Sequence, residues 1–362
     1  MPADKEDAAK AVFTQVQPGL CRSGSAGSGS SDNFRRAGGN RMKGIARLQV
    51  ISVALLLCGI AMAFASHPDA DRLVRMSYKA QETASYSCRI NTIMQDKGKR
   101  LISEADIYKD GRATRINYLS GPAAGTSVID NGRTIMRFVP VERLVYVIAP
   151  ERENLSLMLS NYSPEPAGRG MVAKRSCFII RLAPIHKGNP WKKLWIDRDS
   201  YLTLRTDSYN SDGRLISSTE LHSVNCRPQS PKLFAVPKGW KTRQISYGAI
   251  SLDLLPVSSK AGVKPVRPGY IPKGYKFAGY GLTKPSPPIE CVTLRYTNGL
   301  NSITLMETKG KCTGRKPCCK TDCMFSKRRH ARMVQRHFKG LNIVLISDIA
   351  KGELIKMAES LK

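Results

Sequence analysis

Residues 193–224, with the sequence KLWIDRDSYLTLRTDSYNSDGRLISSTELHSV, constrain the fold more than any other stretch of this chain. Side chains alternate there at period two, with aliphatic residues on one side of an extended strand and polar or aromatic residues on the other. Residues 197–200 and 210–213 interrupt the alternation with turn chemistry, because Asp and Asn bond their own backbone and Gly accepts positive φ. The segment therefore predicts three antiparallel strands joined by two hairpins.

The same signal recurs along the chain. Asp110-Gly111, Asn131-Gly132 and Asn298-Gly299 each separate two strand-like runs, and such dipeptides are the strongest short-range hairpin signals. The sequence therefore predicts an α+β protein of mainly antiparallel strands. It argues against a doubly wound nucleotide-binding fold.

An export signal lies near the N-terminus. The apolar run 50–65 ends in Ala63-Phe64-Ala65 and is short for a membrane span of about 20 residues. Five cations precede it: Arg35, Arg36, Arg41, Lys43 and Arg47. Residues 42–65 are therefore interpreted as a cleaved signal peptide or, as the alternative, a retained anchor. The Gly/Ser-rich residues 1–41 are expected to be a disordered extension.

The chain is strongly basic, with 58 Lys and Arg against 28 Asp and Glu, a formal charge of +30. Residues 66–362 keep 50 basic and 24 acidic residues, or +26. Such a charge often indicates nucleic-acid binding, but an exported protein does not encounter nucleic acid in its compartment. Anionic lipid, acidic polysaccharide or an acidic protein are the partners that remain, beside a surface that is simply basic throughout.

Eight cysteines follow the apolar run, and an even number in an exported chain suits disulfide pairing. The candidates are Cys88, Cys177, Cys226, Cys291, Cys312, Cys318, Cys319 and Cys323. We expect at least two disulfides, one of them within residues 312–323. Zinc ligation there, with His330 and His337, is the alternative, but the C-x₅-C-C-x₃-C spacing lacks the usual C-x₂-C pairs, so no metal site is assigned. Free thiols are the third possibility.

Two domains are expected. Residues 66–232 form the first, which opens with a helix whose apolar stripe is Leu73, Val74, Ser77 and Ala80 and whose first turn has Asp69 or Asp71. Residues 233–261 are expected to be a linker. Residues 262–362 form the second domain, which contains the cysteine-rich basic insertion. Its last helix is expected to have Asp348 as N-cap and an apolar stripe of Leu354, Ile355, Met357, Ala358 and Leu361.

Several of these segments together resemble the MucB/RseB family of extracytoplasmic sigma-factor regulators. The resemblance rests on DRLVRMSYKAQETASYSC, YLSGPAAGTSVIDNGRTIMRFVP, LWIDRDSYLTLRTDSYNSDGRL and LFAVPKGW, and later on IPKGYKF, LRYTNGLNSITLME and NIVLISDIAKGELIKMAESLK. It covers roughly residues 70–362, and the Leu-Trp-Ile-Asp hairpin is its most distinctive piece. The sequence departs from the family in the insertion at 312–323, in its other cysteines and in its N-terminal extension.

The resemblance implies a half-open LolA-like β-barrel with helices, followed by a smaller α+β domain. It also implies a periplasmic, non-enzymatic regulator that binds the periplasmic segment of a membrane anti-sigma factor and senses lipid or a lipopolysaccharide-like amphiphile. A LolA-like carrier of lipid or lipoprotein is the alternative, and the second domain favours regulation. An envelope hydrolase is disfavoured, because the sequence has no G-x-S-x-G, no H-E-x-x-H and no phosphate-cradling glycine loop. No catalytic residue, cofactor or nucleic-acid partner is assigned.

Two groups of binding residues are candidates. Trp191, Trp195, Tyr201 and Tyr209 could line a ligand cleft, although core packing explains the tryptophans equally well. The segment 309–339 holds eleven Lys and Arg against one acid. It is either a solvated loop or a contact to anionic lipid head groups, in which each cation contributes about 1 kcal/mol. Its candidate contacts are Lys327, Arg328, Arg329 and Arg332.

Overall fold

The structure is a computed structural model that describes residues 69–96, 99–148, 153–236, 239–244, 252–254, 257–258, 262–286, 289–309, 323–328 and 331–362. The expected N-terminal extension and signal peptide lie outside these ranges. Within the described ranges, no helix has both the length and the apolar character that a membrane span requires.

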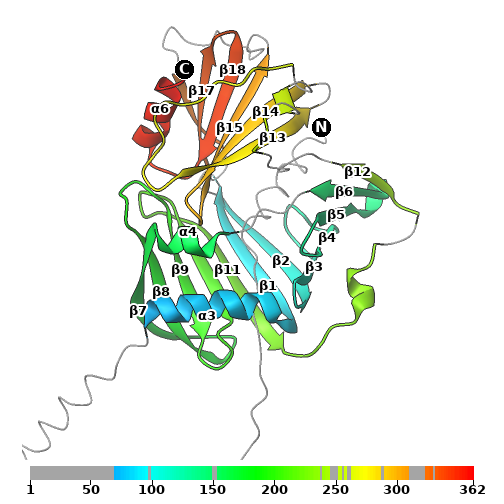
Figure 1. Ribbon diagram of the computed structural model, residues 1–362. Helices are drawn as coiled ribbons and strands as arrows, with labels where there is room; N and C mark the ends of the chain where they lie inside the picture. The colour runs from blue at the N-terminus through cyan, green and yellow to red at the C-terminus, as the bar shows by residue number, and fades with distance from the viewer. Residues whose placement is uncertain are drawn as a thin grey trace, which may run out of the picture.

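The first sheet has twelve strands, in the order β12-β6-β5-β4-β3-β2-β1-β11-β10-β9-β8-β7. It does not close on itself, because β12 and β7 remain at opposite edges (Figure 1). The strands are β1 (Ser85–Asp96), β2 (Lys99–Asp110), β3 (Ala113–Tyr118), β4 (Ser127–Asp130), β5 (Ile135–Val139), β6 (Leu144–Ile148), β7 (Tyr162–Val172), β8 (Arg175–Pro184), β9 (Trp191–Asp197), β10 (Thr203–Tyr209), β11 (Leu215–Asn225) and β12 (Lys241–Gln244). Short 3-10 helices, η2 (Pro140–Glu142) and η3 (Pro231–Phe234), lie in the connections.

The expected hairpins are confirmed. Strands β9, β10 and β11 pair antiparallel through the two turns anticipated between residues 193 and 224. Asp110-Gly111 joins β2 to β3, and Asn131-Gly132 joins β4 to β5. The mainly antiparallel, unclosed sheet agrees with the expected half-open barrel.

Strand β12 is the exception to the antiparallel pattern. It pairs parallel to β6, with Lys241 opposite Leu144. The range expected to be a linker therefore contributes an edge strand to the first sheet.

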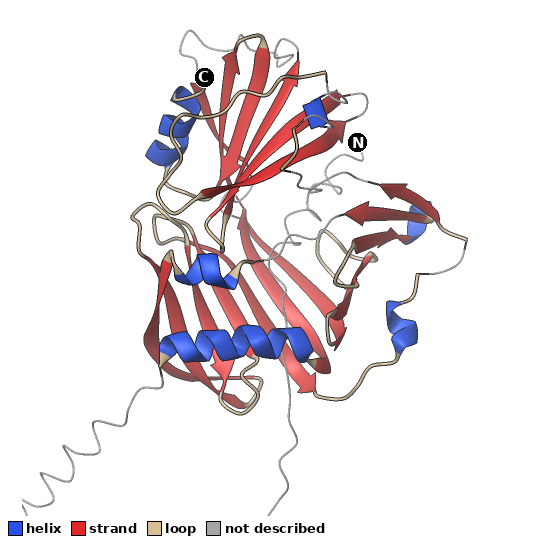
Figure 2. Cartoon of the chain, in the orientation of Figure 1, coloured by secondary structure: helices blue, strands red, loops and turns tan. Residues whose placement is uncertain are grey.

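Two helices, α3 (Ala70–Thr83) and α4 (Leu155–Leu159), lie across one face of this sheet (Figure 2). Helix α3 begins where Asp69 Oδ1 accepts the Asp71 N–H at 3.0 Å, which satisfies one free backbone donor of the first turn. Its buried stripe contains the expected Leu73, Val74, Ser77 and Ala80.

The second sheet has six strands in the order β13-β14-β15-β18-β17-β16. They are β13 (Lys276–Ser286), β14 (Ile289–Thr297), β15 (Ser302–Lys309), β16 (Cys323–Arg328), β17 (Ala331–Phe338) and β18 (Leu341–Ser347), and α6 (Lys351–Glu359) follows. Leu354, Met357 and Ala358 of α6 pack into the core of this sheet. The expected N-cap is wrong, because Ala350 occupies that position and Asp348 lies two residues earlier, before the helix begins.

Candidate ligand- and partner-binding face

The sheet face that carries α3 is apolar across several neighbouring strands. Directly opposed residues share a face, and Leu221 lies opposite Ile90, which in turn lies opposite Ala105. All three are buried. Nearer β9, the face is covered by α3, since Leu194 and Ile196 pack in one cluster with Leu73 and Val74. Such a face offers apolar area to an acyl chain or an apolar peptide segment.

Small hydroxyl groups cross this apolar face in a narrow band. The hydroxyls of Thr92 and Thr219 lie 3.2 Å apart on adjacent strands. Ser77 of α3 lies 2.7 Å from the Thr203 hydroxyl, to which Gln81 also donates at 3.3 Å. Buried polar groups are costly unless paired, so these bonds fix the position of α3 on the sheet.

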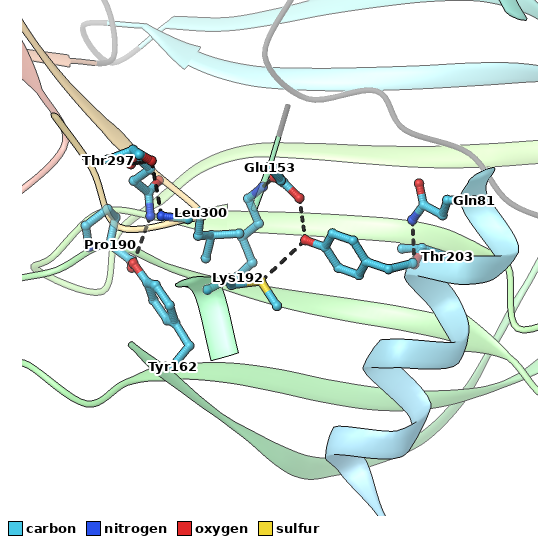
Figure 3. A network of polar contacts seen from close by, with 12 residues as sticks. Gln81, Glu153, Tyr162, Pro190, Lys192, Thr203, Thr297 and Leu300 are labelled. Carbon is cyan, nitrogen blue, oxygen red and sulfur yellow. Dashed lines mark hydrogen bonds and ion pairs between the residues drawn. The ribbon is translucent and has the colours of Figure 1, made fainter. Parts of the chain in front are cut away.

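Glu153, immediately before the cap of α4, joins three elements (Figure 3). Its Oε1 accepts a hydrogen bond from Lys192 Nζ of β9 at 2.6 Å, and its Oε2 accepts the phenolic hydrogen of Tyr78 from α3. The Tyr78 hydroxyl also lies 3.3 Å from Met158 Sδ of α4. Burial, followed by the charge of Glu153, raises the pKa of Tyr78 well above its usual range. The phenol therefore stays protonated and able to donate.

The hairpin tip between β14 and β15 reaches into the first sheet at Tyr162 (Figure 3). Asn298 Nδ2 and Asn301 Nδ2 donate to the Tyr162 hydroxyl at 2.8 and 2.9 Å, and that hydroxyl donates to Pro190 O at 3.0 Å. Burial raises the pKa of Tyr162 to about 12 against the opposing effect of the two amides. Leu300, at the same tip, packs in the core cluster beneath α3.

Gly299 makes the close approach of this tip possible. Its O accepts the Asn154 N–H at 3.1 Å, and its φ is +92°. A Cβ at this position would lie 2.2 Å from Met158 N. Only glycine combines that backbone conformation with so short a distance to α4.

Arg332 of β17 makes a second contact between the sheets. It donates to Ser211 Oγ at 2.7 Å and to the carboxylate of Asp212, both in the β10–β11 turn, and to Ile349 O. Nearby Asp348 has one carboxylate oxygen without a hydrogen-bond partner among the described residues. Burial raises the pKa of Asp348 to about 6, and the charge of Arg332 opposes that rise.

Comparison with known proteins identifies the first sheet. A family model described as the MucB/RseB N-terminal domain matches residues 71–239. Residues 71–239 are a MucB/RseB domain. The match spans α3 to β11 and ends before β12 and the second sheet. No curated protein sequence matches the chain.

Solved structures of MucB share the fold over both sheets. MucB in the Pseudomonas aeruginosa MucA/MucB complex has 16% identity and a TM-score of 0.60, covering 81% of this chain and 98% of that one. MucB in complex with MucA(peri) gives the same values. MucB alone has 15% identity and a TM-score of 0.53, covering 82% and 98%.

Three of the four aromatic candidates lie on the face of the MucB/RseB domain that points away from α3. Trp191 and Tyr209 stack with ring centroids 3.8 Å apart, and Arg205 lies 4.6 Å from the centroid of Trp195. Tyr201 instead packs beside the α3 cluster, with φ +57° in the β9–β10 turn. The structure therefore does not bring the four together in one cleft.

The basic segment is described only in part. Arg332 is 7% exposed and binds the MucB/RseB domain, so the expectation that it contacts an anionic surface is wrong. Lys327 and Arg328 belong to β16, and Arg329 lies outside the described residues.

The cysteines differ from one another. Cys88, Cys177 and Cys291 are buried free thiols, so the expectation that these three join disulfides is wrong. Burial raises the pKa of Cys88 to about 12 and suppresses the reactive thiolate. Cys226 is disulfide-bonded. Cys323 belongs to β16, and Cys312, Cys318 and Cys319 lie outside the described residues, as does the expected disulfide of that loop.

Sequence reasoning missed the residues that join the two sheets. The Asn298-Gly299 signal identified a turn, but no local pattern shows that a turn will dock on Tyr162 and α4. Glu153 was missed and Arg332 was given the wrong role for the same reason. Their contacts to Lys192 and Ser211 span 39 and 121 positions of the chain. The described residues hold no group of three or more His, Cys, Asp or Glu able to bind a metal.

Proposed function

We propose that this chain is an exported, non-enzymatic regulator that binds the extracytoplasmic segment of a membrane anti-sigma factor and thereby modulates an envelope-stress sigma factor. The observation that carries the proposal is the docked pair of sheets. A MucB/RseB domain is joined to a second sheet in a fold shared with MucB, and two of the solved MucB structures are complexes with MucA.

The apolar face beneath α3 supports a second ligand, a lipid or lipopolysaccharide-like amphiphile. An acyl chain on this face would gain about 25 cal/mol for each Å² of apolar area removed from water. A ligand that shares or distorts the peptide site lowers peptide affinity, and the peptide lowers ligand affinity by the same factor. The proposed regulator would therefore bind less of the anti-sigma segment when amphiphile is present in the envelope.

The test is calorimetric titration of the full chain with the extracytoplasmic segment of the anti-sigma factor, repeated with palmitate. We expect stoichiometric peptide binding that palmitate weakens. Transfer of fluorescent lipid between vesicles without any peptide binding would instead favour the LolA-like carrier.

The domain division proposed for this function is 66–232 for the first domain and 262–362 for the second, with β12 of the intervening segment pairing onto the first sheet. Residues 42–65 would direct export, and the protein would reside in the periplasm. Immunoblotting of periplasmic and membrane fractions distinguishes a cleaved signal from a retained anchor.

We also propose that Lys327, Arg328 and Arg329 contact anionic head groups. Reversal of all three to Glu should weaken binding to phosphatidylglycerol vesicles, since each cation near such a surface contributes about 1 kcal/mol. The matched control reverses three exposed cations of the first sheet, Lys99, Arg100 and Arg112. Equal binding by both variants would leave these three cations without a role in head-group binding.

A further inference from the structure

The short helix α4 (Leu155–Leu159) is held from two sides. On one side, Met158 Sδ contacts the Tyr78 hydroxyl of α3 at 3.3 Å. On the other, the backbone at Asn154 and Met158 receives the Gly299 tip of the second sheet. Any displacement of α4 therefore disturbs contacts to both α3 and the second sheet.

The tip is also part of the core of the MucB/RseB domain. Leu300 is 8% exposed and belongs to the same cluster as Leu73 and Val74 of α3 and Ile180 and Leu182 of β8. The second sheet therefore supplies a side chain that helps hold α3 down. Interiors pack densely, so removing or shifting one member of such a cluster changes its neighbours.

The apolar face beneath α3 is buried in this arrangement. A ligand can reach a buried face only by displacing what covers it. Over β8 and β9 this cover consists of α3 and α4. The tip contacts α4 directly and shares the core cluster with α3.

We propose that α4 and the tip Gly299-Leu300 form a coupling element that links amphiphile occupancy of the first-sheet face to release of the second sheet. This inference rests on the proposed function and supplies its structural route. An amphiphile bound on the face displaces α3 and α4, and the tip thereby loses the surface on which it docks. Docking of the tip holds both helices against the sheet and opposes occupancy, as reciprocal linkage requires.

The test is hydrogen exchange on the full chain, comparing Gly299→Ala with Gly340→Ala. Both glycines lie in hairpin turns of the second sheet with positive φ, +92° and +75°. A Cβ at 340 meets nothing within 4 Å, whereas one at 299 meets the backbone of α4. The two variants share the backbone strain and differ in the interdomain contact.

Gly299→Ala should accelerate exchange of the α3 and α4 amides about tenfold, because the docked tip no longer opposes local opening of the two helices. Gly340→Ala should leave those amides unchanged. Equal acceleration by both variants, or acceleration confined to the β14–β15 hairpin, would overturn the coupling. Leu300→Ala, which keeps the turn and removes only the packed side chain, provides the same comparison should Gly299→Ala fail to fold.

A second experiment measures the effect of palmitate. Its binding to the wild-type chain should accelerate exchange at residues 298–301, and Gly299→Ala should bind it about fivefold more tightly because the competent state is more populated. Palmitate that binds without affecting residues 298–301 overturns the coupling. Failure of palmitate to bind refutes the amphiphile in the proposed function, and the variant comparison alone then decides the coupling between tip and helices.

Discussion

Asn298 Nδ2 donates a 2.8 Å hydrogen bond to the hydroxyl of Tyr162, and this buried bond joins two residues that are 136 positions apart and lie in different sheets. Asn301 makes a parallel bond to the same oxygen. The hydroxyl of Tyr162 therefore accepts two bonds from the second sheet and donates one to Pro190 O within the first domain.

Removal of that hydroxyl should loosen the interface. Tyr162→Phe leaves two amide donors and the Pro190 carbonyl without their partner, and each unsatisfied buried group costs about 1–3 kcal/mol. We expect a loss of about 3 kcal/mol in the free energy of unfolding by urea. Tyr108→Phe on β2, a partly buried tyrosine outside this interface, is the control and should change stability little. Equal loss in the two variants would contradict the role of Tyr162.

Charge removal at Glu153 should release α3 from β9. Glu153→Gln removes a partly buried ion pair with Lys192, whose side chains are 23% and 13% exposed. A loss of about 1 kcal/mol in unfolding free energy is expected after solvent screening is considered. Glu165→Gln, whose pair with Arg181 is about half exposed and 3.8 Å long, should have almost no effect. A larger loss of unfolding free energy in Glu165→Gln than in Glu153→Gln would show that partial burial does not strengthen the Glu153–Lys192 pair.

Asp197 should make stability fall in acid. Burial alone would raise its pKa, but hydrogen bonds from Arg175 and Ser200 outweigh burial and hold the pKa below its usual value. Its stabilisation is therefore present above the unfolded pKa, about 4, and is lost as pH falls through the lower folded value. Asp197→Asn should cost about 2 kcal/mol at pH 7 and flatten the acid limb of a stability–pH profile.

The exposed neighbour Asp199 is the matched control for this turn, and Asp199→Asn should retain the acid limb. Loss of the acid limb in Asp199→Asn but not in Asp197→Asn would show that Asp199, and not Asp197, is its source.

Glu307 should give the opposite dependence in the second sheet. Burial raises its pKa to about 8, while the 2.9 Å hydrogen bond from the Val266 N–H opposes the rise. The folded state therefore favours the protonated acid, and its contribution is complete below about pH 4 and is lost as pH rises to about 8.

Glu307→Gln should therefore be more stable than the wild type above pH 8, with a smaller slope between pH 4 and 8. Thermal unfolding across pH 4–9 measures this difference. The exposed Glu359→Gln is the control and should follow the wild-type profile. A wild-type slope in Glu307→Gln would exclude this carboxyl as its source.

Local patterns predicted the strands and turns because hairpin chemistry and period-two alternation act within a few residues. The β9–β10–β11 meander and the stripe of α3 followed directly from such patterns. The Asn298-Gly299 turn was likewise predicted, but its docking on Tyr162 was not, since nothing near residue 298 encodes a contact 136 positions away.

The binding residues were predicted less well for related reasons. Tyr201 and Tyr209 were both candidates for lining a ligand cleft, yet Tyr201 lies in a turn with positive φ and packs beside α3. Positive charge marked Arg332 as a surface residue, whereas its guanidinium bonds a turn of the other sheet. Parallel pairing of β12 was unexpected because four residues, KTRQ, carry no apolar alternation.

The position of β12 sets how the two sheets can part. The chain leaves the first sheet from the β12 edge, while the contacts at Tyr162 and Asp212 involve β7 and the β10–β11 turn, on the other side of the strand order. Opening those contacts therefore produces a tethered second domain rather than a separated one. A short tether keeps such a domain at an effective concentration on the order of millimolar. Reclosure is then unimolecular, and its rate is independent of the protein concentration.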